Sequence, residues 1–267
     1  MLGKLIKYDL KYGVRMFIIL HVVLLGVCTL GRFFYMERID FHAPVNTIIS
    51  SLIVFTSVLI LLFTAVCFGI TALIAVRFYK NLFTDEGYLT WTIPATATQH
   101  LMAKIISGVI WESGNLLLCS LALWILVSGK NVTTAYAEVS PEVTHTLGMP
   151  LGQFGIIGLL YALLGTLGSV IIVYLCICIG QLFPGHHVLC SIVVYFIFTA
   201  ITQIVTFAMM FAFKIAPGSA NYYRMMEGNP SYYMLTSFRI SAIMSVFIII
   251  IGYIAVHYIM NKKVNLS

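Results

Sequence analysis

Charged residues are scarce in this sequence. Asp, Glu, Lys and Arg make up 9% of its 267 residues, whereas hydrophobic residues make up 61% and the mean hydropathy is +1.01. Globular domains contain about 25% charged residues, so the composition excludes an ordinary soluble protein. No stretch between the apolar runs reaches the roughly 50 residues of a small independent domain. We therefore expect one all-α, polytopic membrane domain over residues 1–267.

The sequence also lacks the motifs of several kinds of chemistry. The phosphate-binding pattern GxxxxGK[ST] is absent, so any ATP hydrolysis would have to come from another chain. No Ser-His-Asp order, carboxylate pair or HExxH helix is present. We therefore expect no catalytic site, no cofactor bound by this chain and no nucleic-acid partner. His186 and His187 are adjacent but lack Cys or carboxylate partners, which is a poor arrangement for zinc, and we expect no metal site.

The cysteines show no spacing typical of disulfides or metal sites. All six lie within apolar runs, and none forms a CxxC pair. They are Cys28, Cys67, Cys119, Cys176, Cys178 and Cys190. We expect them to act as small buried hydrophobic residues.

Apolar runs long enough to cross a bilayer dominate the chain, since a crossing needs roughly 20 residues. We place six spans at residues 16–35, 47–76, 105–128, 154–183, 188–213 and 240–260. An even number of crossings puts both termini on one side. Residues 183–187 predict a tight turn between the fourth and fifth spans. The fourth run carries Gly155, Gly158, Gly165 and Gly168, which permit close helix packing within the chain or with a second chain.

Residues 1–15 predict an amphipathic helix that lies at the membrane interface, because apolar and basic residues recur on opposite helical faces. The apolar set is Leu2, Leu5, Ile6, Leu10, Gly13 and Val14. The basic set is Lys4, Lys7, Lys11 and Arg15. The basic face suits anionic lipid headgroups, with each residue contributing about 1 kcal/mol. A second interpretation is that these charges only fix the topology.

Basic residues also orient the predicted bundle, because Lys and Arg are enriched on the cytoplasmic side of membranes. Segments on the N-terminal side contain nine of them and segments on the opposite side six. We therefore expect cytoplasmic termini and a cytoplasmic linker at 77–104, in a bacterial plasma membrane. The outward loops would be 36–46, 129–153 and 214–239. The last loop carries four tyrosines among Pro and Gly residues, which permits short helices at the interface.

The linker at 77–104 is the longest polar break in the first half of the chain. Its middle contains two acids, a glycine and Pro94, which predict a short helix along the membrane surface at 81–88 and a turn after it. The string FTDEGYLTWTIP, followed by Lys104 at the start of the next span, resembles the linker between the second and third membrane helices in permease subunits of type-2 ABC exporters.

The resemblance implies that the linker holds a coupling helix, which docks into a groove of a cytosolic ABC ATPase. The ATPase-coupling residues would be Leu82, Phe83, Asp85, Glu86, Gly87 and Tyr88. Of these, Leu82 and Phe83 would be apolar anchors, and the two acids would meet basic residues of the partner. ATP and Mg²⁺ would be bound by the ATPase. Two permease chains, identical or related, would export a peptide, an antibiotic or a lipid-like amphiphile.

Glu112 is the acid that lies deep in a predicted span, where a carboxylate costs about 3 kcal/mol. It would serve the transport path or a subunit contact, or it would form a structural hydrogen bond, for example to Gln203 or His257. The alternative function is a secondary transporter or an intramembrane enzyme that uses Glu112. A secondary carrier usually has several intramembrane ionisable residues or paired broken helices, whereas the sequence offers one such residue.

Overall fold

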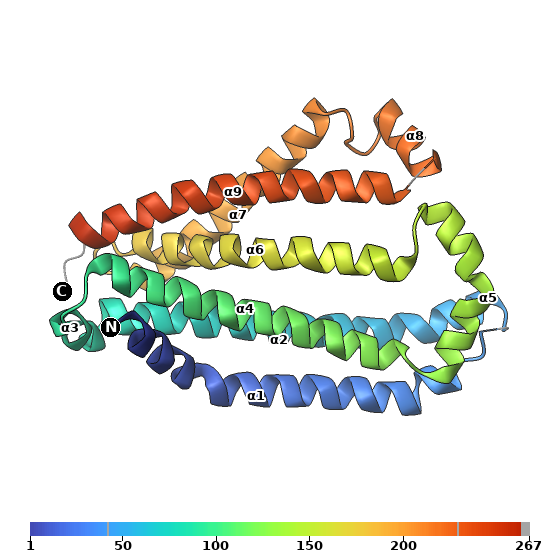
Figure 1. The fold of residues 1–267 in the computed structure, drawn as a ribbon, viewed down its shortest axis with the longest axis horizontal. Helices are drawn as coiled ribbons and strands as arrows, with labels where there is room; N and C mark the ends of the chain where they lie inside the picture. The colour runs from blue at the N-terminus through green and yellow to red at the C-terminus, as the bar shows by residue number, and fades with distance from the viewer. Residues whose placement is uncertain (42, 229, 263–267) are drawn as a thin grey trace.

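The computed structural model describes residues 1–41, 43–228 and 230–262, and these residues form helices with no strand among them (Figure 1). In chain order the elements are α1 (Leu2–Phe34), the 3-10 helix η1 (Met36–Arg38), α2 (Val45–Phe83), α3 (Asp85–Thr92), α4 (Ala97–Val127), α5 (Lys130–Leu147), α6 (Leu151–Gly180), α7 (His187–Ala212), α8 (Ala220–Gly228) and α9 (Pro230–Lys262).

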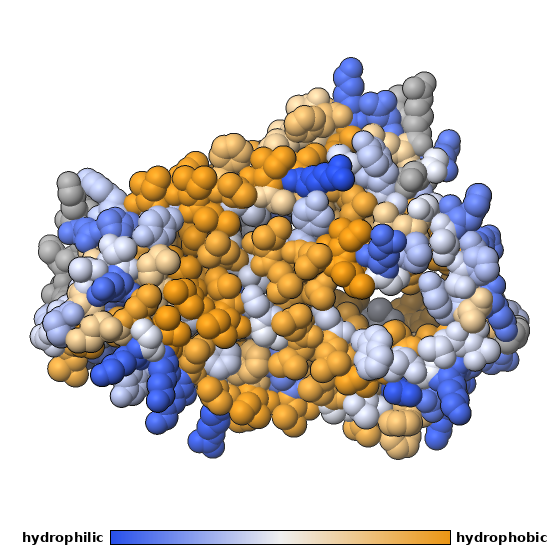
Figure 2. Space-filling model, in the orientation of Figure 1, coloured by the Kyte–Doolittle hydropathy of each residue, from blue (hydrophilic) through white to orange (hydrophobic). Residues whose placement is uncertain are grey.

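Six of the described helices, α1, α2, α4, α6, α7 and α9, are long and apolar enough to cross a membrane. Figure 2 shows an apolar band across the middle of the molecule and hydrophilic residues at both ends. Because such a band needs an apolar surrounding, the chain is an all-helical, multi-pass membrane protein. The all-helical class and the six helices long and apolar enough to span a membrane, both expected from the sequence, are confirmed.

The long helices form two groups of three. Helices α1, α2 and α4 pack against one another, as do α6, α7 and α9, while α4 and α2 contact α6 between the groups. Helix α3 lies at the end of the bundle where α1 begins and α9 ends, and α5 lies at the opposite end (Figure 1). We refer to these as the α3 end and the α5 end.

The two groups pack tightly in the half of the bundle nearer the α3 end. The buried residues of α6 all fall in its second half, from Thr166 to Gly180. Phe78 of α2, Leu101 of α4 and Val256 of α9 join them in one core. Towards the α5 end α4 and α6 diverge, and the surface is hollowed between them (Figures 1 and 2). The interior of the bundle is therefore closed at one end and open at the other.

The four glycines of α6 that the sequence analysis singled out differ in what surrounds them. A Cβ atom on Gly168 would contact Ser245 of α9 at 3.7 Å, and one on Gly158 would contact Phe238 of α9 at 3.7 Å. Gly155 and Gly165 have open space around them. Two of the four glycines therefore lie against another helix of the same chain.

The N-terminal segment is continuous with the first span, whereas the sequence predicted a separate helix over residues 1–15. Helix α1 runs unbroken from Leu2 to Phe34, although it bends after its first turns (Figure 1). The expected basic face is exposed, and most of the expected apolar face is at least partly buried. Two residues differ: Val14 is exposed, and the charged Asp9 lies on the buried face.

The linker at 77–104 is shorter than expected, because both flanking helices extend into it. Helix α2 continues past residue 76 to Phe83, and α4 begins at Ala97, where Thr96 and Gln99 form a capping box. The short helix covers Asp85–Thr92, not residues 81–88. Lys104 therefore lies two turns inside α4 instead of opening the span at the membrane boundary.

The expected loops at the α5 end contain much helix. Residues 130–147 form α5, which ends where Gly148 adopts a left-handed conformation with φ of 78°. The expected loop at 214–239 contains α8, and α9 already begins at Pro230. At the α3 end, the tight turn between α6 and α7 is confirmed, with Gly185 at φ of 90°.

Candidate functional site

Helix α3 is a short helix flanked by two residues in extended conformation, Thr84 and Ile93. Thr84 adopts an extended conformation after α2, and its hydroxyl donates a hydrogen bond to the Lys80 carbonyl at 2.6 Å. At the other end Ile93 is extended, because the following Pro94 disfavours helical geometry at the residue before it. These two positions fix the length of α3 and turn it away from the axis of α2.

Side chains of α3 fasten it to the end of α2. The Asn81 amide donates a hydrogen bond to the Thr90 hydroxyl at 3.1 Å, and that hydroxyl donates to the Glu86 carbonyl at 3.0 Å. The Trp91 indole N–H donates to the Leu82 carbonyl at 3.3 Å. The Trp91 ring also lies 5.5 Å from the ring of His100 in the first turn of α4. One face of α3 is thus attached to both neighbouring helices.

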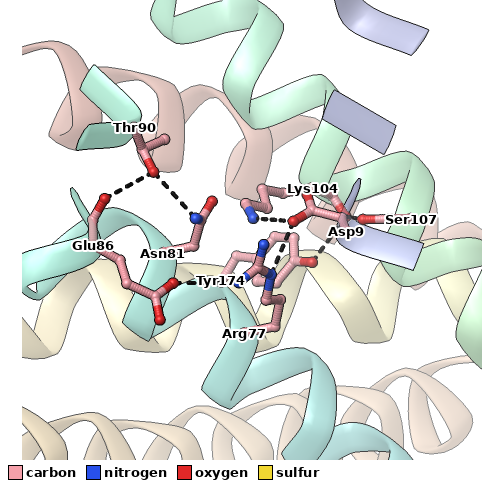
Figure 3. A network of polar contacts seen from close by, with 8 residues as sticks. All are labelled: Asp9, Arg77, Asn81, Glu86, Thr90, Lys104, Ser107 and Tyr174. Atoms are coloured by element: carbon pink, nitrogen blue, oxygen red, sulfur yellow. Dashed lines mark hydrogen bonds and ion pairs between the residues drawn. The ribbon is translucent and has the colours of Figure 1, made fainter. Parts of the chain in front are cut away.

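A charged network connects α3 to the interior of the bundle (Figure 3). The Asp9 carboxylate of α1 accepts hydrogen bonds from Arg77 Nε of α2 at 3.0 Å and from Lys104 Nζ of α4 at 2.6 Å. Arg77 Nη1 also pairs with Glu86 Oε2 of α3 at 3.3 Å. Two basic side chains therefore meet two acidic ones. The Asp9 and Lys104 side chains are 6% and 4% exposed, whereas Glu86 is 52% exposed.

Helix α6 completes the network through the backbone of α4. The Tyr174 hydroxyl donates a hydrogen bond to the Lys104 carbonyl at 2.9 Å, and the Ser107 hydroxyl donates to the same carbonyl at 3.0 Å. The Tyr174 ring stacks on Phe78 with the ring centres 3.9 Å apart. The free space beside these groups is about 10 Å³, which is close to the least that holds one water.

The charged side chains Asp9, Arg77 and Lys104 connect three helices, and we call this cluster the joint. The space beside it is too small for a ligand. Buried charges are costly unless they are paired, and losing one partner of a buried pair costs about 3–5 kcal/mol. Asp9, Arg77 and Lys104 therefore hold α1, α2 and α4 in one relative position. Because Arg77 also pairs with Glu86, a displacement of α3 acts on the same group of charges.

The structure divides the six expected coupling residues into two sets. Leu82 is fully buried, so it is not free to enter a groove of a partner, and Phe83 is partly buried against the core. Gly87 is also buried. Asp85, Glu86 and Tyr88 are exposed. The exposed apolar side chain that the sequence analysis missed is Leu89, which is 74% exposed.

The buried acid of the joint was also missed. Asp9 lies among the apolar residues of its helical face, between Ile6 and Gly13, and a lone acid in such a row indicates an intramembrane partner. Its partners are remote in sequence, at separations of 68 and 95 residues. The position of Asp9 on the apolar face of residues 1–15 is a signal in the sequence that it is buried. No local pattern in the sequence identifies Arg77 and Lys104 as its partners.

Glu112 lies apart from this joint, in a second set of polar contacts within α1, α2 and α4. Its Oε1 atom accepts a hydrogen bond from the Thr71 hydroxyl of α2 at 3.0 Å. The expected alternatives are not its partners, since His257 contacts Thr98 and Gln203 is exposed. One turn further along α4, the Asn115 amide oxygen lies 3.1 Å from His21 Nε2 of α1. These contacts place two ionisable side chains, Glu112 and His21, well inside the bundle.

Within the described residues, no group of three His, Cys, Asp or Glu side chains is placed to hold a metal ion, and the six cysteines are free. Comparisons with models of protein families, with curated proteins and with solved structures found no match to this chain.

Proposed function

We propose that this chain is the permease subunit of an ATP-driven exporter and that α3 is its coupling helix. In this proposal the α3 end is cytoplasmic, a separate ATPase subunit binds ATP and Mg²⁺, and two permease chains form the path. The cargo would be a peptide, an antibiotic or a lipid-like amphiphile. The observation that carries the proposal is the attachment of α3 to a buried charged joint, through the ion pair between Glu86 and Arg77.

An ATP-driven membrane bundle needs a rigid projection through which movement of the ATPase reaches the spans. Helix α3 meets this need in two ways. Its hydrogen bonds to Asn81 and Leu82 tie it to the end of α2. The joint then connects α2 to α1 and α4 through Asp9. A displacement of α3 by the ATPase would therefore move α1, α2 and α4 together.

The face of α3 that points away from the bundle has the features of a docking surface. Tyr88 and Leu89 are 54% and 74% exposed, and Asp85 beside them is also exposed. Aromatic and apolar anchors usually dominate interface energy, with about 2 kcal/mol or more lost on truncation, whereas charges at the rim contribute less. Leu89 and Tyr88 take the place of Leu82 and Phe83 as the proposed anchors.

Affinity purification of the full-length chain from membranes of its own source tests the proposal. We expect an ABC ATPase to co-purify with the unaltered chain and to be lost, by about tenfold or more, with Leu89→Asp. Val139→Asp is the matched control, because Val139 is an exposed apolar residue of α5 at the opposite end. The proposal fails if no ATPase co-purifies, or if Leu89→Asp retains as much ATPase as Val139→Asp.

A second function, a proton-coupled carrier, is favoured by Glu112 and His21 together. Both ionisable groups lie within the spans, and each has a hydrogen-bond partner on a neighbouring helix. Carriers of this kind use such groups as proton relays. Its test is proton entry into vesicles that contain the chain alone and a pH-sensitive dye. Entry that Glu112→Gln abolishes would favour the carrier over the exporter.

A further inference from the structure

His21 of α1 lies inside the bundle and is held in one orientation. It is 2% exposed. Its Nδ1 atom lies 2.8 Å from the Phe17 carbonyl oxygen, and the centres of the His21 and Phe17 rings lie 4.1 Å apart. Because a carbonyl oxygen can only accept a hydrogen bond, Nδ1 carries a hydrogen. Nε2 is therefore the ring nitrogen at which a proton can be gained or lost.

Nε2 of His21 faces the Asn115 side chain of α4, which is also buried. The Asn115 amide oxygen lies 3.1 Å from Nε2. An amide oxygen can only accept, so Nε2 also carries a hydrogen in this orientation. A ring with a hydrogen on both nitrogens is an imidazolium cation. The arrangement in the structure is therefore that of a histidine with a bound proton.

The same amide can serve the neutral ring. If the Asn115 amide turns over about its last bond, its NH₂ group takes the place of the oxygen and donates a hydrogen bond to a bare Nε2. A carboxylate in this position could only accept, and an apolar side chain could do neither. An asparagine beside Nε2 therefore suits a histidine that both binds and releases a proton.

The other contacts of the amide are satisfied in both orientations. In the structure Asn115 Nδ2 lies 3.6 Å from Cys67 Sγ of α2, and the amide oxygen lies 3.6 Å from Cys119 Sγ of α4. A thiol is a weak donor as well as a weak acceptor. Cys67 therefore accepts from the amide in the present orientation and donates to it after the turn, while Cys119 does the opposite. Neither orientation leaves a buried polar group without a partner, which would carry a desolvation cost.

The helices around His21 also supply a counter-charge. A single charge within a span costs about 3 kcal/mol. Glu112 precedes Asn115 by one turn of α4, and its carboxylate together with the imidazolium has no net charge. The charged joint is farther away, since Asp9 lies about 18 Å from His21 along α1. The remaining titratable side chains on the packed helices α1, α2 and α4 at this depth are the thiols of Cys28, Cys67 and Cys119.

We propose that His21 and Asn115 form a proton-binding site inside the bundle, in which the Asn115 amide turns over when Nε2 gains or loses its proton. One proton from water adds to Nε2 and returns to water on release, and no bond between heavier atoms forms or breaks. The turn exchanges donor and acceptor at Cys67, so the state of α1 is transmitted to α2. The inference goes beyond the exporter proposal, and it requires neither an ATPase nor a transported proton.

The test is the protonation state of His21 in the full-length chain, reconstituted in lipid vesicles with ¹⁵N-labelled histidine. Solid-state nuclear magnetic resonance separates a bare ring nitrogen from a protonated one, and the His21 signal is the one lost in His21→Gln. Histidine usually changes its charge between about pH 8 and pH 5. We expect a bare Nε2 at the upper limit and a protonated one at the lower limit. A ring that keeps one state at both limits overturns the proposal.

Two substitutions of Asn115 should act in opposite directions. Asn115→Leu removes the acceptor, so His21 should keep a bare Nε2 at about pH 5. Asn115→Asp supplies a group that only accepts, so His21 should stay protonated at about pH 8. Asn261→Leu is the matched control, because that amide contacts His257 at the α3 end, and it should leave the His21 signal unchanged. Changes of the same direction in both Asn115 variants would indicate a purely structural asparagine and overturn the proposal.

The turn of the amide has a separate readout in the unaltered chain, which does not depend on the folding of an Asn115 variant. The infrared S–H stretching band of Cys67, identified by its loss in Cys67→Ser, moves to lower frequency when the thiol donates a hydrogen bond. We expect the lower frequency when His21 is neutral, since the amide oxygen then faces Cys67. A band that stays fixed while His21 gains its proton overturns the proposal. A chain that passes both tests but binds no ATPase would uphold the proton site and overturn the exporter.

Discussion

Asp9 Oδ1 accepts a hydrogen bond from Lys104 Nζ at 2.6 Å, across 95 residues of sequence. The same oxygen accepts a hydrogen bond from Arg77 Nε. One buried carboxylate thus pairs with basic side chains on two other helices, while Glu86 supplies the second negative charge through Arg77. The energetics of this contact lead to the first prediction.

Asp9→Asn should strongly destabilise the bundle, because it leaves Lys104 buried without an opposite charge. Breaking a buried ion pair in this way costs about 3–5 kcal/mol. Adding Lys104→Met to Asp9→Asn should recover much of the loss, since Arg77 keeps Glu86 as its partner. Thermal unfolding in detergent measures both variants. Glu86→Gln is the control and should cost less than about 1 kcal/mol, because the Glu86 side chain is 52% exposed and Arg77 keeps Asp9 as its partner. Equal losses in Asp9→Asn and Glu86→Gln would show that the joint contributes little.

Phe83→Ala should affect stability and not docking, because Phe83 packs against Phe78 and Tyr79 near the end of α2. Truncation of a partly buried aromatic side chain should lower the free energy of unfolding by about 2 kcal/mol. Leu89→Ala, on the exposed face of α3, should change it by less than about 0.5 kcal/mol. Unfolding in detergent ranks the two variants, and a larger loss for Leu89→Ala would contradict the burial seen here.

Gly13→Ala should be destabilising, because its Cβ atom would lie 2.9 Å from Leu73 and 3.0 Å from Trp111. Overpacking of this kind costs about 1–3 kcal/mol. Gly26 is in the same helix, but a Cβ atom there would meet nothing within 4 Å. Gly26→Ala should therefore be neutral or stabilising by up to about 1 kcal/mol. If the two variants unfold at the same temperature, α1 does not pack as closely against α2 and α4 as described.

Glu112→Leu should fold nearly as well as the unaltered chain. Glu112 accepts a hydrogen bond from the Thr71 hydroxyl. The same hydroxyl also lies within hydrogen-bonding distance of the Cys67 carbonyl, at 3.1 Å. Loss of the carboxylate therefore leaves that hydroxyl with a partner, and the cost should stay below about 1.5 kcal/mol. Unfolding in detergent checks the stability. Transport by Glu112→Gln, which keeps the accepting oxygen, then separates a charged role from a structural one.

The orientation expected from the basic residues can be tested with an impermeant thiol reagent. In a background with the six native cysteines replaced, Glu142→Cys on α5 should be labelled in intact cells. Asp85→Cys on α3 should be labelled only after the membrane is opened. Both positions are exposed, so a difference in labelling reports the side of the membrane. Labelling of Asp85→Cys from outside would reverse the orientation and exclude a cytoplasmic ATPase at α3.

Local sequence patterns were sufficient to predict the spans, but not the ends of the helices. Apolar runs of 20 residues or more identify spans whatever their packing. The polar linker expected from residue 77 onward put the end of the second span at residue 76. In the structure the side chains of Asn81 and Thr84 instead make hydrogen bonds that close the end of a longer helix. Their sequence neighbours do not reveal these partners, so the extension past residue 76 could not be predicted.

The joint was missed for a related reason. Lys104 was interpreted as a boundary residue, since a basic side chain at the edge of an apolar run usually reaches the membrane surface. Its burial depends on Asp9, which comes from another helix. Conversely, Leu82 and Phe83 were expected to be docking anchors because they lie in the linker that resembles that of exporter permeases. Leu82 is buried in one core with residues of α4, α6 and α9, and Phe83 packs partly against that core. Such contacts follow from the tertiary arrangement and not from local composition.

Helix α2 is long enough for a small tilt to produce a large displacement at its far end. Its 39 residues make a rod of about 58 Å, roughly twice the thickness of the hydrocarbon core. Near the α3 end Arg77 pairs with Asp9 of α1 and Phe78 stacks on Tyr174 of α6. Further along, Leu59 and Val66 pack only within the group of α1, α2 and α4. From Arg77 to Val45 the helix measures about 48 Å, so a tilt of about 5° about the contact at Arg77 would move the distant end sideways by about 4 Å. Small movements at α3 would thus be magnified at the opposite face of the membrane, where α4 and α6 already stand apart.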